Sequence, residues 1–106
     1  MEGITSTRRD VFGNEVVLTE ERLRHILKRP EMKGQELRIL ETLESPVEVR
    51  RSIHDRNVWL FYRFFHRTPV GSKYLAVVVK VLSRRGFIIT SYFTDRIKKG
   101  EIVWKA

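Results

Sequence analysis

The 106-residue sequence has no cysteine, only 6 glycines and no long apolar run. The absence of cysteine excludes a disulfide framework, a thiolate nucleophile and cysteine ligands for a metal ion. No apolar stretch approaches the length of a membrane-spanning helix, and the N-terminal residues lack the hydrophobic region of a secretory signal. We therefore expect a cytoplasmic protein with no membrane partner. Because the glycines are scattered along the chain, a glycine-rich phosphate-binding loop is excluded as well.

Histidine is scarce too, and the three that are present do not form a metal-binding pattern. His25, His54 and His66 fall in three separate predicted elements, without the paired short spacing of metal ligands. No cluster of carboxylates supports them. The sequence also lacks the nucleophile-elbow pattern that accompanies a Ser-His-Asp hydrolase. We therefore expect no metal site and no cofactor.

Positive charge is what the chain has in excess. Lysine and arginine together number 21, against 13 aspartates and glutamates, which gives a net charge of +8 at pH 7. Such an excess favours a polyanionic partner, either nucleic acid, an acidic protein or an anionic membrane surface. The plainer interpretation is a basic protein without such a partner. The length predicts a single domain over residues 1–106, of which 1–10 are polar, aperiodic and expected to form a flexible lead-in.

The order of the predicted elements indicates the fold class. A short strand at 15–18 precedes two helices at 20–28 and 35–44; Thr19 is a suitable N-cap for the first, and Pro30 ends it. The rest of the chain has the pattern of strands joined by turns, at 47–53, 58–66, 74–82 and 87–94, with a short edge strand at 102–104. Helices followed by a run of strands predict an α+β fold. We expect N-terminal helices packed on one face of a four- to five-stranded antiparallel β-sheet.

The strands at 74–82 and 87–94 form a predicted hairpin with two unlike faces. Side chains alternate across a strand, so odd and even positions point to opposite faces. The odd positions from 75 to 93 are almost all apolar. The even positions include a group of polar and aromatic side chains, namely Tyr74, Lys80, Thr90, Tyr92 and Thr94. The even face is therefore where a functional site is expected.

The first predicted helix adds a histidine to these polar groups. His25 falls nearly opposite the apolar stripe of this helix, on the same side as Arg22 and Arg29. It is either an ordinary exposed residue or a site residue between two cations. A set of His, Arg, Lys, Tyr and Thr suits metal-independent RNA cleavage, because the 2′-hydroxyl needs a base, the leaving oxygen an acid and the phosphate fixed cations. Taken singly, each tyrosine is as well explained by cross-strand packing and Lys80 by exposure to solvent.

Several short motifs resemble one known group of proteins. They are VLTEERLRHI at 17–26, RPEM at 29–32, YLAVVVK at 74–80 and FIITSYFT at 87–94. Together they resemble the phage-associated nuclease-like domains of the barnase–EndoU–colicin–RelE ribonuclease superfamily, over about residues 16–94. The resemblance implies a small α+β fold in which the first helix and the open face of the sheet form a metal-free RNA-cleaving site.

The resemblance also implies roles for particular residues. The helix histidine of the group corresponds to His25, and the hydroxyls of its last strand correspond to Thr90, Tyr92 and Thr94. A basic residue of the strand after the helices corresponds to Arg51, with Arg63 as the alternative. Members often carry His-Pro-Glu after the helix, whereas this chain has Arg29-Pro30-Glu31.

These observations predict a toxin-like, metal-independent endoribonuclease that cleaves RNA through 2′-hydroxyl transesterification. His25 would be the general acid or base, Arg51 and Lys80 would stabilise the phosphate charge, and Tyr92 and Thr94 would orient the phosphate. The predicted RNA-binding residues are Arg22, Arg29, Tyr62, Arg63, Tyr74, Thr90, Arg96, Lys98 and Lys99. Two alternatives stay open: a non-catalytic nucleic-acid-binding module, and an interaction domain for an acidic protein such as an antitoxin or immunity protein. The nuclease hypothesis requires His25 to lie over the polar face of the hairpin.

Overall fold

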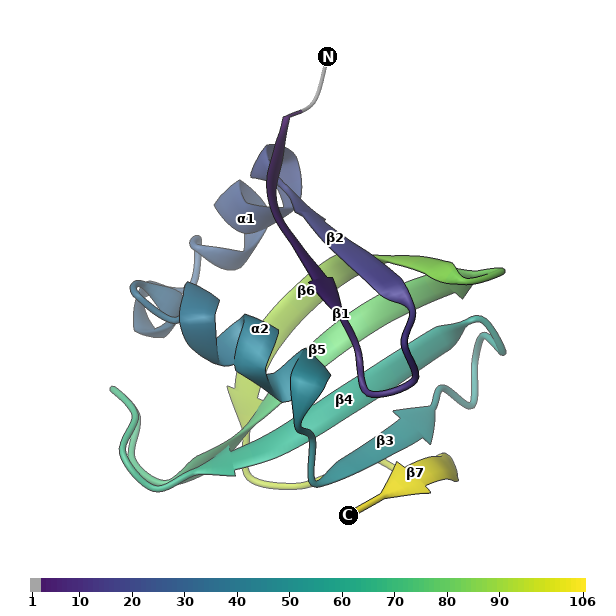
Figure 1. The fold of residues 1–106 in the computed structure, drawn as a ribbon. Helices are drawn as coiled ribbons and strands as arrows, with labels where there is room; N and C mark the ends of the chain where they lie inside the picture. The colour runs from purple at the N-terminus through teal and green to yellow at the C-terminus, as the bar shows by residue number, and fades with distance from the viewer. Residues whose placement is uncertain (1–2) are drawn as a thin grey trace.

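One mixed β-sheet dominates the computed structural model, which describes residues 3–106 (Figure 1). Within these residues seven strands are arranged in the order β1-β2-β6-β5-β4-β3-β7, and two α-helices and a 3-10 turn connect β2 to β3. The elements are β1 (Ile4–Arg9), β2 (Glu15–Thr19), α1 (Glu20–Ile26), the 3-10 turn (Pro30–Met32), α2 (Glu36–Glu44), β3 (Glu48–Arg51), β4 (Val58–Phe65), β5 (Lys73–Leu82), β6 (Arg85–Thr94) and β7 (Glu101–Lys105).

The predicted fold class is wrong in its strand count and its pairing. The sheet has seven strands in the described chain instead of four or five, and it is mixed because β2 pairs with β6 in parallel. The N-terminal residues expected to form a flexible lead-in include β1, which pairs antiparallel with β2. β1 was missed because it is a mostly exposed edge strand without apolar alternation. An ion pair from Arg8 to Glu44 joins it to α2.

Both helices pack on one face of the sheet and form the main core with it. Ile26 of α1 and Leu43 of α2 are fully buried in a cluster that also contains Phe61 and Val77. Phe12, in the β1–β2 turn, covers more of this face and lies edge-on to Phe61 with ring centroids 6.2 Å apart. The other face of the sheet carries no helix, and we call it the open face (Figure 1).

A bulge in β6 changes which of its side chains reach the open face. Val78 pairs with Thr90 but Val79 pairs with Ile88, so Ile89 is one extra residue in β6. The predicted alternation therefore holds only beyond the bulge, where Thr90, Tyr92 and Thr94 lie on the open face. Before the bulge the faces are exchanged: Ile88 is buried in the main core, and Phe87 pairs with Lys80 on the open face.

The connection between β6 and β7, residues 95–100, crosses the open face, and we call it the crossover. It must pass over the sheet because β6 and β7 lie on opposite sides of β5, β4 and β3. The backbone N–H of Lys98 donates to the hydroxyl of Tyr62 on β4 (3.2 Å), and Arg50 on β3 donates to the carbonyl of Gly100 (3.2 Å). The crossover thus divides the open face into two parts. No helix within residues 3–106 is long and apolar enough to cross a membrane.

Candidate functional site

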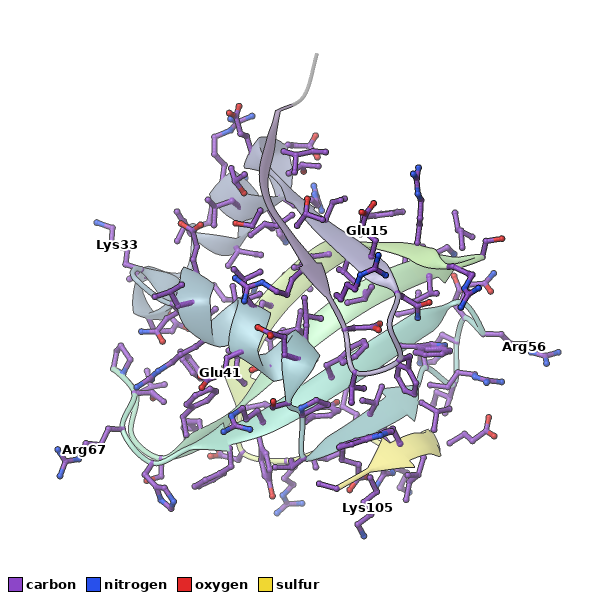
Figure 2. All side chains as sticks on the ribbon, in the orientation of Figure 1. Glu15, Lys33, Glu41, Arg56, Arg67 and Lys105 are labelled. Carbon is purple, nitrogen blue, oxygen red and sulfur yellow. The ribbon has the colours of Figure 1, made fainter. Side chains whose placement is uncertain are left out.

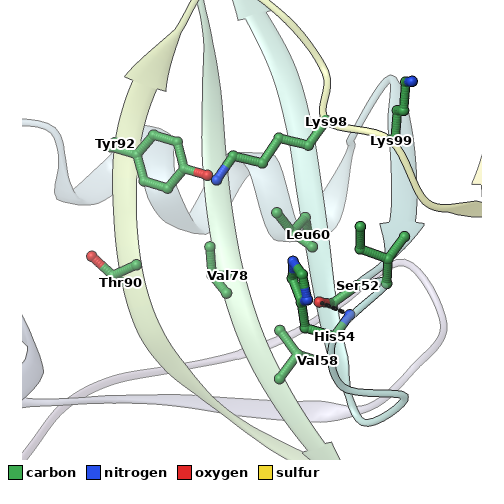
Figure 3. Close-up of a pocket in the computed structure, with 10 residues that line it drawn as sticks. Ser52, His54, Val58, Leu60, Val78, Thr90, Tyr92, Lys98 and Lys99 are labelled. Atoms are coloured by element: carbon green, nitrogen blue, oxygen red, sulfur yellow. Dashed lines mark hydrogen bonds between the residues drawn. The ribbon is translucent and has the colours of Figure 1, made fainter.

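A pocket of about 380 Å³ lies on the open face, between the crossover and the loop that joins β3 to β4 (Figure 3). Its floor is apolar and comes from β4 and β5, whereas its walls carry hydroxyl, imidazole and ammonium groups. The lining residues are Ser52, Ile53, His54, Val58, Leu60, Val78, Thr90, Tyr92, Lys98 and Lys99. None of these is a carboxylate and two are lysines, so the side chains that line the pocket carry a net positive charge.

His54 supplies the imidazole of this pocket, and a short loop holds it there. Its backbone N–H donates to the hydroxyl of Ser52 (3.1 Å), and its ring extends over the apolar floor near Leu60 and Val58 (Figure 3). The side chain is exposed, so it is accessible to a ligand. Histidine exchanges a proton near neutral pH, which suits acid–base chemistry at this position.

The same loop is anchored to the sheet by an ion pair. Asp55 Oδ2 lies 2.6 Å from the ammonium of Lys80, and its other oxygen accepts from the N–H of Asn57 (2.9 Å). The hydrogen bond from Lys80 is the main reason why the pKa of Asp55 is lowered from its usual value. Lys80 was predicted to stabilise a phosphate, but its charge is neutralised by Asp55, and it does not line the pocket.

Two cations lie against the ring of Tyr92 at the β6 side of the pocket. The guanidinium carbon of Arg29 is 5.5 Å from the ring centroid, and the ammonium of Lys98 is 5.3 Å from it. Arg29 also donates to the hydroxyl of Thr90 (3.3 Å) and to the carbonyl of Ser91 (3.4 Å). A cation near an aromatic face is attracted by the ring quadrupole. These contacts hold positive charge at the edge of the pocket.

The arginines of the α1 region have a structural role at the edge of β6. β2 pairs with β6 only over the first residues of β6, and beyond them α1 lies at this edge. Arg22 donates a hydrogen bond to the carbonyl of Ile89 (3.2 Å), which is the extra residue of the bulge. Arg29 likewise donates to the carbonyl of Ser91. His25 lies on α1 between these two arginines and is half-buried, but it does not line the pocket.

Arg51 and Arg63 are the two candidates for the basic residue of the strand after the helices. Both lie on the helix-covered face of the sheet, opposite to the pocket. Arg51 pairs with Trp59 on the helix-covered face and forms an ion pair with Glu101 (3.3 Å). Arg63 pairs with Leu75 on the same face. Strand alternation alone separates them from the pocket, since Thr90 and Tyr92 project from the other side. Neither arginine can contact a ligand there.

The remaining predicted residues lie under or beyond the crossover. Tyr62 is fully buried and accepts the hydrogen bond from Lys98, so it supports the pocket without lining it. Tyr74 and Thr94 form a cross-strand pair beyond the crossover, and the Thr94 hydroxyl bonds to the backbone of Arg96. Of the predicted site residues, Thr90, Tyr92, Lys98 and Lys99 line the pocket, and Arg29 lies beside it in contact with Tyr92 and Thr90. The other predicted residues lie outside the pocket, namely Arg22, His25, Arg51, Arg63, Tyr74, Lys80, Thr94 and Arg96.

Two polar residues of the pocket, Ser52 and His54, were not predicted from the sequence, nor were the apolar lining residues Ile53, Val58, Leu60 and Val78. His54 begins the turn His54-Asp55-Arg56-Asn57, whose composition indicates only a β-turn. No local pattern shows on which face of a sheet a turn side chain will lie. Among residues 3–106, no three His, Asp or Glu side chains lie close enough together to hold a metal ion.

Comparison with known proteins adds no relative. No protein-family model matches the sequence, and no curated protein or solved structure is significantly similar to the chain. The resemblance to the ribonuclease superfamily therefore stays a prediction, and the function is argued from the pocket itself.

Proposed function

We propose that the chain binds RNA in the pocket of the open face and cleaves it through attack of the 2′-hydroxyl on the adjacent phosphate. The observation that supports this most is the composition of one pocket, where His54, Tyr92, Lys98 and Lys99 lie on the walls and no carboxylate is among the lining residues. The net charge of +8 favours the approach of a polyanion to such a site. A cytoplasmic location belongs to the same proposal.

Each group of the pocket suits one part of this reaction. Arg29, Lys98 and Lys99 would bind the phosphate and stabilise the charge that develops on it. His54 would either take the proton from the 2′-hydroxyl as it attacks the phosphorus or give a proton to the 5′-oxygen as its bond to phosphorus breaks. Tyr92, with a cation close to its ring, would orient the phosphate through its hydroxyl. The apolar floor of the pocket would hold a base.

A second candidate function is RNA binding without cleavage. It is favoured by the placement of the predicted catalytic cations, because Arg51 lies on the opposite face and Lys80 is paired with Asp55. His54 is also the one imidazole among the lining residues, whereas cleavage requires both an acid and a base. Binding alone would leave the RNA intact and would weaken steeply with salt.

The test is an RNA-cleavage assay in EDTA with the three histidine variants. We expect the wild type to cleave, and His54→Ala to lose activity by about a hundredfold or more, the usual contribution of a proton-transfer group. In a parallel assay on a dinucleotide, which is too short to reach beyond the crossover, His66→Ala is the matched control, since His66 is exposed just after β4 and outside the pocket. His25→Ala distinguishes the pocket from the helix as the source of the imidazole.

Three outcomes decide between the hypotheses. Loss of cleavage in His54→Ala alone supports the pocket as the site of cleavage. Full activity of His54→Ala together with loss in His25→Ala would move the acid–base role to α1. If the wild-type protein binds RNA but leaves it intact, the function is binding without cleavage.

A toxin-like role further predicts growth arrest on expression, relieved by His54→Ala or by a co-expressed acidic partner such as an antitoxin or immunity protein.

A further inference from the structure

An exposed aromatic cluster lies on the open face, beyond the crossover from the pocket. The ring of Phe64 is edge-on to those of Tyr74 and His66, with centroids 5.1 Å apart in both cases. Tyr74 is in turn 6.5 Å from Tyr62, which lies beneath the crossover. Phe64 is 37% exposed although it is a large apolar side chain on β4, which has a neighbouring strand on each side. Neither the main core nor the proposed reaction accounts for this exposure.

The aromatic cluster and the pocket lie on the same two strands, on either side of the crossover. Phe64 and Tyr74 are cross-strand neighbours on β4 and β5, the two strands that also form the pocket floor. Val78, in the floor, and Tyr74 are four residues apart on β5. At about 3.3 Å per residue this places the two sites about 13 Å apart along the strand. One extended ligand can therefore contact both.

The crossover between the two sites presents positive charge along its length. Its three cations are Arg96, Lys98 and Lys99. The carboxylates at its two ends are already neutralised, because Asp95 is paired with Lys73 and Glu101 with Arg51. Within residues 3–106, no carboxylate lies within ion-pair distance of the three cations. A chain of phosphates crossing here would meet only unneutralised positive charge.

We infer that the cluster of Phe64, Tyr74 and His66 is a second binding site, which takes a base of single-stranded RNA while the adjacent phosphates lie on the crossover. Bases of a single strand are free to stack on aromatic side chains, whereas those of a duplex are paired and stacked on one another. The inference rests on the proposed function in that RNA is the ligand, and it adds that the substrate is single-stranded and spans both sites. It does not require cleavage.

Binding of 2′-O-methylated RNA, which cannot undergo 2′-hydroxyl attack, tests the inference separately from catalysis. Fluorescence anisotropy would compare a single strand of about ten nucleotides, the same strand in a duplex, and a dinucleotide. We expect Phe64→Ala to weaken binding of the long single strand by about tenfold and to leave dinucleotide binding unchanged. Phe64→Leu, which keeps an apolar side chain but removes the ring, should behave like Phe64→Ala.

Phe87→Ala is the matched control. Phe87 is on the same face and is 41% exposed, but it lies near the β5–β6 turn, on the far side of the pocket from Phe64. Its replacement should leave binding unchanged. Wild-type affinity in both Phe64 variants, or equally tight binding of the duplex, would overturn the inference while RNA binding itself stands. Failure of the wild type to bind any of the three ligands would instead overturn the proposed function.

Discussion

The hydrogen bond between Tyr62 and Lys98 is the contact whose removal tests the architecture of the site most directly. It is the point at which the crossover is bonded to the centre of the open face, and Lys98 is one of the lining residues. Tyr62→Phe removes the hydroxyl and keeps the ring, which is fully buried. The main consequence should therefore be a less tightly held crossover.

The size of this effect follows from the geometry of the bond. A neutral hydrogen bond with a donor–acceptor distance of 3.2 Å is an ordinary one, and its loss typically costs about 0.5–1.5 kcal/mol. For a chain of 106 residues, about 1 kcal/mol corresponds to a fall in Tm of about 4–5 °C. If the loss is confined to local opening of the crossover, the same energy gives about fivefold faster amide exchange at Lys98.

Hydrogen exchange monitored by NMR measures this opening at single amides. We expect faster exchange at Lys98 in Tyr62→Phe, together with weaker RNA binding, since a mobile crossover no longer holds its ammonium group at the pocket. Tyr74→Phe is the control, because it removes the hydroxyl of a half-buried tyrosine that makes no side-chain hydrogen bond within the described chain. Unchanged exchange at Lys98 in Tyr62→Phe would show that the bond does not hold the crossover.

The ionisation of Tyr62 provides an independent measure of the burial of its phenol beneath the crossover. Burial raises the pKa of Tyr62 above its usual value of 10.0, whereas the phenol of the unfolded chain titrates normally. Stability is therefore unaffected by this group below about pH 10 and falls as the pH rises toward the pKa of the folded state. Urea titrations across this range should show the fall in the wild type and a smaller one in Tyr62→Phe. An equal fall in both proteins would contradict the burial of an ionisable group here.

Two further substitutions test the ends of the site. Gly100→Ala should cost about 1–3 kcal/mol of folding free energy in a urea titration, because its Cβ would lie 2.3 Å from the carbonyl oxygen of Arg51. Lys105→Ala, an exposed change in the adjacent edge strand β7 (Figure 2), should cost less than about 0.5 kcal/mol. Asp55→Asn leaves the ammonium of Lys80 without a counter-charge beside the pocket, since Lys80 pairs with the lining residue Val58. The salt dependence of RNA binding should then steepen by up to about 0.7 in log–log slope, the value for one phosphate contact; an unchanged slope would show that Lys80 stays out of reach of the ligand.

Much of the local structure was predictable because it depends on neighbours in sequence. The Thr19 N-cap is confirmed by a hydrogen bond from the N–H of Arg22 to its hydroxyl (3.2 Å). The strands predicted at 58–66, 74–82 and 87–94 agree closely with β4, β5 and β6, whose runs of β-branched and aromatic residues fit a pleated surface.

The residues that the prediction misplaced depend on non-local geometry. The bulge at Ile89 exchanges the faces of the residues before it, and a single extra residue leaves no distinct mark in a run of apolar side chains. Arg51 was assigned to the site by resemblance, whereas strand parity puts it on the opposite face.

The site itself depends on one topological feature, the position of β7 at the far edge of the sheet. If β7 had paired beside β6, residues 95–100 would form a hairpin turn at the edge, and Lys98 and Lys99 would project into solvent. Because β7 pairs with β3 instead, the connection must cross the open face, and its two lysines become a wall of the pocket opposite Thr90. A five-residue edge strand with few distinctive residues thus determines where the cations of the site lie. This is why the same lysines could be recognised in the sequence as a basic segment but not placed next to His54.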